Sequence, residues 1–467
     1  MGYQTPSIDR RRGICCNTGT RRSSGLSRRP ESGDRRCNVL VKIILALVVA
    51  AVMLTVPVTS DAGGLFLTEL GTEDVALAGA GWAARAQDAS TLFKNPAGMS
   101  RLQGNQFQGG LQGLYFQGKF NPSVASKGGG DGSNPVGALP AASGFYVHSL
   151  SKDLKVGLGI FSNFGLALKY DDDWAGRYYV RDSALMGVTV APVASYRVNE
   201  WISIGGGPNI MAGYLKYTAA VNNLGPGDGQ LQVKDMTVGV GGQFGVLFEP
   251  HKSTRFGVTY YSPIKLNFSD NPSLSGLGPV NEGLFGGLRN ASLGLGMTVP
   301  QHVMASAYHE LTDRFAIMGN LGWENWNRFG KVDVNLVSQD TTISTTTAIP
   351  YQDTYHVAIG SQYRLNQDWL LNSGFAFDSS MVKDQDRSLS LPAGAVYKFG
   401  MGAQWQFSPT TRLGFSYGLA YIGDLPVSQN RGPLAGEVTG QFPTTIMHFL
   451  AVTLNWGSRG VQIGPGR

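Results

Sequence analysis

Hydrophobic residues alternate with small or polar residues along most of this chain, beginning near residue 105. In Leu413–Tyr421, large apolar side chains occupy every second position, and Gly, Ser and Ala fill the positions between them. A period of two residues is that of a β-strand whose two faces differ. About fourteen such segments follow one another, separated by polar connections. The pattern therefore predicts an all-β chain.

The large apolar face of these segments and their small or polar face are those of a transmembrane β-barrel with lipid outside. Because lipid offers no hydrogen bonds, a sheet that spans it must close on itself. We predict a transmembrane antiparallel β-barrel of about fourteen strands over residues 105–456, with one strand beginning near Leu288 and a tail at 457–467. The long polar connections are expected outside the cell: 121–140, 221–229, 269–287, 338–350 and 424–442.

Residues 1–62 have the features of an export leader. Basic residues precede the apolar stretch Ile43–Val58, and Ser60 and Ala62 place small side chains at a signal-peptidase site, which predicts cleavage after Ala62. The leader holds ten Lys or Arg and four acidic residues, so it carries the whole net charge of +6. The remainder is formally neutral, which argues against a nucleic-acid partner and against a soluble β-sandwich. All three cysteines also lie in the leader: Cys15, Cys16 and Cys37.

A segment of another kind, residues 63–104, lies between the leader and the first strand. Small residues dominate its middle, and Asn95-Pro96-Ala97 stand near its end. Proline fixes its own φ and pushes the preceding residue out of the helical region. We therefore expect a compact, partly helical and sharply turned plug in the barrel lumen.

This segment, with its Asn-Pro-Ala ending, resembles the N-terminal hatch of the FadL family of outer-membrane long-chain fatty acid and aromatic hydrocarbon transport proteins. Further stretches resemble the same family in the same order: GLGIFSNFGLALKYDDDWAGRYYVRDS from Gly157, APVASYRVNEWISIGGGPNI from Ala191, FGVTYYSPIKLNF from Phe256, WENWNRF from Trp323, and SLSLPAGAVYKFGMGAQW from Ser388. The resemblance covers residues 63–456 and implies a fourteen-stranded barrel of the bacterial outer membrane.

The resemblance also implies roles for particular residues. Asn95, Pro96 and Ala97 would gate the plug. In such barrels the third strand kinks inward and opens the wall toward lipid, which implies a lateral opening at Asn163, Phe164 and Gly165, with the kink at the glycine. Lys216 lies where the family places a basic residue of the ligand pocket. Residues 332–363 contain no Lys or Arg, so a neutral hydrocarbon stays open as a substrate beside a fatty carboxylate.

The expected function is passive uptake of hydrophobic small molecules by a monomer in the outer-membrane bilayer, with no cofactor, no metal and no catalytic residue. A general porin is the first alternative. An outer-membrane lipase or esterase is the second, because Gly414–Gly418 matches the G-x-S-x-G motif of serine hydrolases. That motif needs a turn between a strand and a helix, whereas here it lies inside an alternating segment. The six histidines are scattered without metal-ligand spacing.

Overall fold

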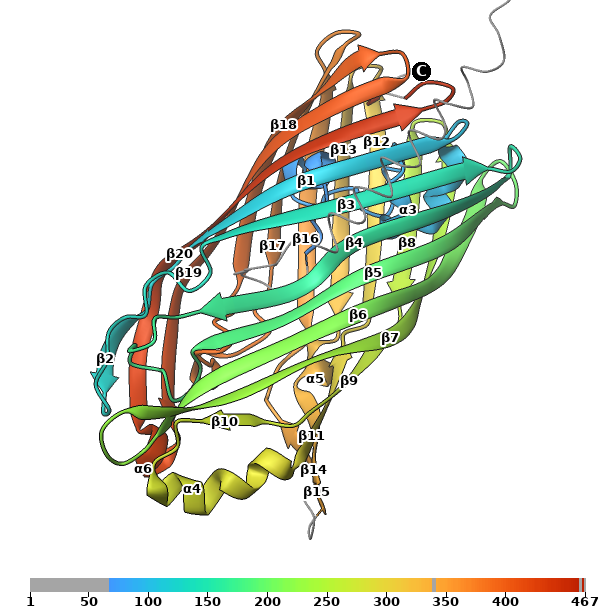
Figure 1. Cartoon of the computed structure of the whole chain (residues 1–467). Coiled ribbons are helices and arrows are strands. Elements are labelled where there is room, and N and C mark those ends of the chain that lie inside the picture. The colour runs from blue at the N-terminus through green and yellow to red at the C-terminus, as the bar shows by residue number, and fades with distance from the viewer. Residues whose placement is uncertain (1–66, 338–341, 462–463, 466–467) are drawn as a thin grey trace, which may run out of the picture. The chain divides into compact units, whose positions relative to one another are not determined.

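The structure, a computed structural model, describes residues 67–337, 342–461 and 464–465. Fourteen strands run antiparallel in one sheet whose first and last members also pair, so the sheet closes into a barrel (Figure 1). Their bounds are β1 (Gln106–Gln117), β3 (Ala138–Ser149), β4 (Leu154–Lys169), β5 (Asp182–Arg197), β6 (Ile202–Asn222), β7 (Asp228–His251), β8 (Thr254–Tyr261), β12 (His302–Thr312), β13 (Phe315–Glu324), β16 (Thr354–Arg364), β17 (Trp369–Asp378), β18 (Val396–Ser408), β19 (Thr411–Asn430) and β20 (Glu437–Gly457). The predicted fold class, an all-β barrel of about fourteen strands, is confirmed. The predicted leader lies outside the described residues.

The alternation of the sequence becomes the two faces of the wall. On β16, Tyr355, Val357 and Ile359 are 60%, 49% and 63% exposed on the outer face, whereas His356 and Ala358 are buried inside. An apolar outer face is what hydrocarbon requires, and closure of the ring gives each of its strands a paired neighbour on both sides.

A second, four-stranded sheet lies off the ring in the order β15-β14-β11-β9. The prediction of a barrel strand from near Leu288 is wrong, because β11 pairs with β9 and β14 in this second sheet. The barrel strand is β12, which begins at His302 after Pro300. Both strands alternate, so periodicity alone could not assign them to different sheets. The remaining strands are β2 (Asn121–Ala125), β9 (Ile264–Asp270), β10 (Ser273–Ser275), β11 (Ser292–Val299), β14 (Lys331–Val337) and β15 (Thr342–Ala348).

The predicted long loops contain regular structure, which includes β2 within 121–140 and β10 within 269–287. Within 424–442, β19 and β20 continue to pair up to Asn430 and Glu437, and within 338–350 the structure has β15. Polar composition marks exposure to water, not the absence of a strand, because backbone pairing does not depend on side-chain polarity. Helices in the connections are α4 (Pro279–Phe285), η2 (Gly286–Asn290), α5 (Trp326–Phe329), η3 (Asp384–Asp386) and α6 (Gly432–Ala435). In the part of the chain that the structure describes, none of the helices has the length and apolar character needed to cross a membrane.

Residues 67–102, which we call the inner segment, lie within the ring of strands. They form α2 (Thr72–Ala76), α3 (Thr91–Lys94) and η1 (Pro96–Arg101), drawn in blue in Figure 1. Helix α2 contacts β17 to β20, whereas η1 contacts β4 to β7 on another part of the ring. Every residue from Thr68 to Ser100 is buried. The inner segment therefore packs against much of the wall from inside.

Glycines on the inner face of the wall let the backbone of the inner segment approach closely. A Cβ atom at Gly257 would overlap the carbonyl oxygen of Ala83, and one at Gly374 would overlap that of Leu77. By contrast, a Cβ atom at Gly113 on β1 would have no neighbour within 4 Å. The many glycines of the chain are thus in part a packing requirement of the inner segment.

Replacing Gly374 by alanine should displace the inner segment, because the added methyl group has no room against Leu77. We expect a loss of about 1–3 kcal/mol in the free energy of unfolding, the usual cost of overpacking. Thermal unfolding of the purified barrel in detergent, followed by circular dichroism, measures it. Gly113→Ala is the matched control, since it makes the same chemical change in open space. Equal stabilities of the two variants would contradict the close approach.

Candidate functional site

The Asn95-Pro96-Ala97 turn fastens the inner segment to itself and to the wall. The amide nitrogen of Asn95 donates to the carbonyl of Ala83 at 2.8 Å and to that of Val246, on β7, at 2.9 Å. Its amide oxygen accepts from the backbone N–H of Ala97 at 3.1 Å, and Pro96 begins η1. One side chain therefore joins three backbone positions.

Two paired glycines leave the wall without side chains opposite this turn. Gly205 on β6 and Gly245 on β7 are direct partners in the ladder. A Cβ atom at Gly245 would overlap the amide oxygen of Asn95, and one at Gly205 would lie 2.6 Å from the backbone nitrogen of Ala97. On the neighbouring strand β5, the hydroxyl of Ser195 donates to the Ala97 carbonyl at 3.2 Å.

A cluster of six buried charges fastens α2 to the opposite wall. The cluster comprises Glu73, Asp74, Arg85, Asp88 and Lys94 of the inner segment and Arg412 of β19. Asp74 lies 2.6 Å from Arg85 and 3.0 Å from Lys94, and Glu73 lies 3.3 Å from Arg412. Three acids and three bases balance, which offsets the cost of burying them.

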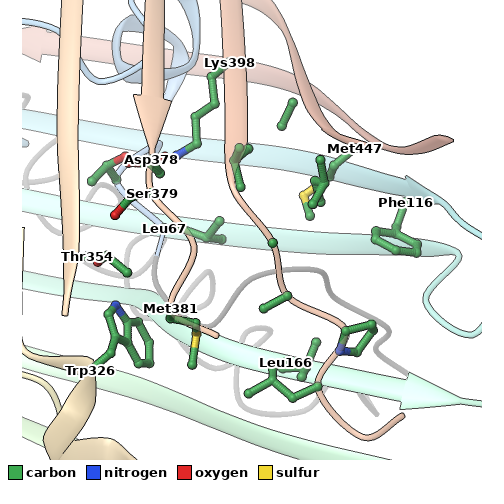
Figure 2. A pocket seen from close by; sticks show the side chains of 18 of the residues that line it. Leu67, Phe116, Leu166, Trp326, Thr354, Asp378, Ser379, Met381, Lys398 and Met447 are labelled. Carbon is green, nitrogen blue, oxygen red and sulfur yellow. Dashed lines mark ion pairs between the residues drawn. The ribbon is translucent and has the colours of Figure 1, made fainter. Parts of the chain in front are cut away.

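An apolar cavity of about 120 Å³ lies between the inner segment and the wall. Leu67 of the inner segment lines it, together with Leu166 and Leu168 of β4 and Met447 of β20. Figure 2 shows Lys398 reaching from β18 toward Asp378 at one end, with Leu166, Phe116 and Met447 further along. The cavity is therefore apolar along most of its length and charged at one end.

Beside this cavity the wall is not fully paired. The ladder between β3 and β4 runs from Ser149 opposite Lys155 to Gly144 opposite Ile160 and stops there. Residues 138–143 of β3 and 161–168 of β4, all of which the structure describes, do not pair with each other. The gap is bounded at its other end, where the Lys169 N–H donates to the Pro135 carbonyl at 2.7 Å. Figure 1 shows β4 bending away from β3 along this seam.

A β-bulge causes the bend in β4. Phe161 pairs with Thr189 of β5 and Phe164 pairs with Gly187, so β4 has one residue more than its partner between these positions. Such bulges bend the strand that carries them. The carbonyl of Asn163 inside the bulge accepts from the Leu67 N–H at 2.9 Å, which ties the start of the inner segment to the bulge.

Gly165 does not produce the bend that the family resemblance implied at this residue. It stays in the ladder opposite Met186 and has no positive φ. The extra residue falls at Ser162 and Asn163, while Phe164 turns inward, 1% exposed, with its ring 6.0 Å from that of Phe329. Gly165 therefore lies close to the bend, but only the pairing of β4 with β5 shows where the bulge is.

Lys216, the predicted ligand-binding cation, forms an ion pair with Asp182 and does not line the apolar cavity. The cation that does line it is Lys398. The sequence offered one indication of this role, because Lys398 is a charged residue at an inward position of the alternating segment Tyr397–Phe407. Within the described ranges, no group of three or more His, Cys, Asp or Glu side chains could hold a metal ion.

A closed antiparallel ring with an apolar outer face defines the protein as a transmembrane β-barrel. Residues 53–449 match the family described as outer membrane protein transport protein (OMPP1/FadL/TodX). The chain belongs to this family. It is therefore a transport protein of the bacterial outer membrane and not an enzyme.

Individual relatives agree with this assignment. The long-chain fatty acid transport protein of Salmonella typhi is 26% identical over 427 residues, which cover 85% of this chain and 95% of the relative. The crystal structure of a Pseudomonas aeruginosa FadL homologue superposes with a TM-score of 0.76 at 20% identity, covering 85% of this chain and all of that one. The Pseudomonas putida toluene transporter TodX gives a TM-score of 0.64 at 16% identity, with 85% of this chain covered and all of that one. The two structures establish the fold.

Replacing Asn95 by alanine should loosen the turn and raise ion leak through the barrel. Three backbone groups would lose this partner, at about 1–3 kcal/mol for each that is buried and left unpaired. Single-channel conductance in planar bilayers measures the leak. Gln103→Ala, an exposed change just beyond the inner segment, serves as the control. A conductance equal to that of the wild type would count against a closing role for this turn.

Proposed function

We propose that this protein carries hydrophobic small molecules passively across the outer membrane and releases them sideways through its wall. The observation that supports this most is the position of the apolar cavity beside the unpaired seam between β3 and β4. Leu166 and Leu168 line the cavity and belong to the part of β4 that has left β3. A solute in the cavity would thus have a short apolar route to the surrounding lipid. The names of relatives, which mention long-chain fatty acids and toluene, fit such solutes.

In this proposal the inner segment acts as a plug. Its buried charges and its contacts with wall glycines oppose the straight flow of water and ions along the barrel axis. The hydrogen bond from Leu67 to Asn163 gives the plug a direct link to the seam. Because Leu67 also lines the cavity, a solute that displaces this residue would disturb the bulge at the same time. Entry from among the extracellular loops would precede this step.

The two alternatives have less support. A general porin needs an open lumen, whereas residues 68–100 are buried within this ring. For a hydrolase, Ser416 would need a turn that exposes its hydroxyl, but it lies inside β19 with regular partners on both sides, Gly402 and Ala451. No strand-to-helix turn surrounds it.

Deleting Asn163 should close the seam and stop transport. The deletion leaves Ser162 opposite Val188 and restores the alternation between inward Phe161 and inward Phe164, so that β4 can continue its ladder with β3. We expect uptake of a hydrophobic probe to fall toward the rate of cells that lack the protein. Uptake by whole cells, with surface level checked by antibody, measures the effect.

Gly165→Ala is the matched control, because it changes the same strand and keeps the bulge. The added Cβ would meet Met186 at 3.2 Å, a contact that a flexible side chain can relieve. We expect this variant to transport normally. Normal uptake by the Asn163 deletion, at a normal surface level, would refute the lateral route.

A further inference from the structure

Carboxylates dominate the charged end of the apolar cavity. Glu324, at the end of β13, and Asp378, at the end of β17, both line it. Lys398 lines it too, but its ammonium lies 2.9 Å from Asp378 and 2.8 Å from Glu69. The cation in the lining is therefore already bound by two acids and is poorly placed to receive a third.

The formal charges at this end do not balance. Glu69, Asp378 and Glu324 supply three carboxylates. Opposite them stand Lys398 and the imidazole of His356, which lies 2.5 Å from Asp378. While Glu324 is ionised, the cluster stays negative even with that imidazole protonated. A carboxylate entering the cavity would meet net repulsion, which is stronger in a site shielded from water.

Glu324 has one oxygen available to a ligand. Its Oε2 accepts from Trp326 Nε1 at 2.7 Å and from Thr354 Oγ1 at 3.3 Å. Among the residues that the structure describes, none donates a hydrogen bond to the other oxygen, Oε1. A carboxylate oxygen is an acceptor only, so it selects a group that donates.

We infer that the apolar cavity takes an uncharged solute with one aromatic ring and a hydroxyl group, which donates to Glu324, and that it rejects carboxylates. This inference rests on the proposed function and narrows its substrate class. The size of the cavity agrees, because about 120 Å³ is close to an apolar protein cavity of about 150 Å³ that holds benzene. An extended fatty chain would need far more space.

Three probes that share one ring separate the possibilities: toluene, p-cresol and p-toluate. We expect the purified barrel, at a mildly alkaline pH that keeps Glu324 ionised, to bind p-cresol about tenfold more tightly than toluene, the usual gain from a hydrogen bond to a charged group. Binding of p-toluate should be at least about tenfold weaker than that of p-cresol, because its charge is repelled. Isothermal titration calorimetry in detergent, with empty micelles as the blank, gives the three affinities.

Two variants locate the effect. Glu324→Gln removes the charge at nearly constant size, so the preference for p-cresol over toluene should shrink to about threefold or less. Ala420→Leu fills the cavity and should weaken both neutral probes. The wild-type series does not depend on either variant folding.

The outcomes separate this inference from the proposed function. If p-toluate or toluene binds as tightly as p-cresol, the selectivity is overturned while hydrophobic uptake stands. If p-toluate binds most tightly and Lys398→Met abolishes its binding, the cavity is a carboxylate site instead. If none of the three probes binds, both the inference and the proposed use of this cavity fall.

Discussion

Backbone hydrogen bonds that lie in hydrocarbon must be made within the protein, and the rest of this structure depends on that constraint. The ring of strands meets it by pairing β1 with β20 along their shared length. The seam described above, between β3 and β4, departs from the rule over residues 138–143 and 161–168. Unpaired backbone at membrane depth is tolerated where it lines a cavity or is buried in protein. The apolar cavity and the inner segment lie beside the seam.

The inner segment and the wall are complementary in packing and in charge. Glycines such as Gly205 and Gly245 remove side chains where the Asn95 turn approaches, and their pairing in the ladder places both gaps together. On the other side, Arg412 joins a charge cluster that is otherwise supplied by the inner segment. Fixing the segment at both sides leaves its beginning, at Leu67, as the part in contact with cavity and seam.

Much of this could be predicted from the sequence. Alternation identified the wall, and the small residues with Asn95-Pro96 identified a compact segment of a different kind. The second sheet could not be predicted, because β11 and β12 carry the same alternation and differ only in their partners. The bulge at Asn163 could not be predicted for the same reason, because a bulge is defined by how two strands pair with each other. Lys398 and Lys216 each form an ion pair with an acid on the neighbouring strand, and only their place in the barrel distinguishes them, because Lys398 lines the cavity and Lys216 does not.

The central claim, that solutes leave through the seam, can be tested by closing the seam reversibly. All three cysteines lie in the predicted leader, so Ala142→Cys and Ser162→Cys would introduce the only thiols of the exported chain. These positions would be the next outward pair if the ladder continued beyond Gly144 and Ile160. Uptake of a hydrophobic probe should stop when a short reducible cross-linker joins them and return when it is cleaved. Undiminished uptake by fully cross-linked protein would contradict the account.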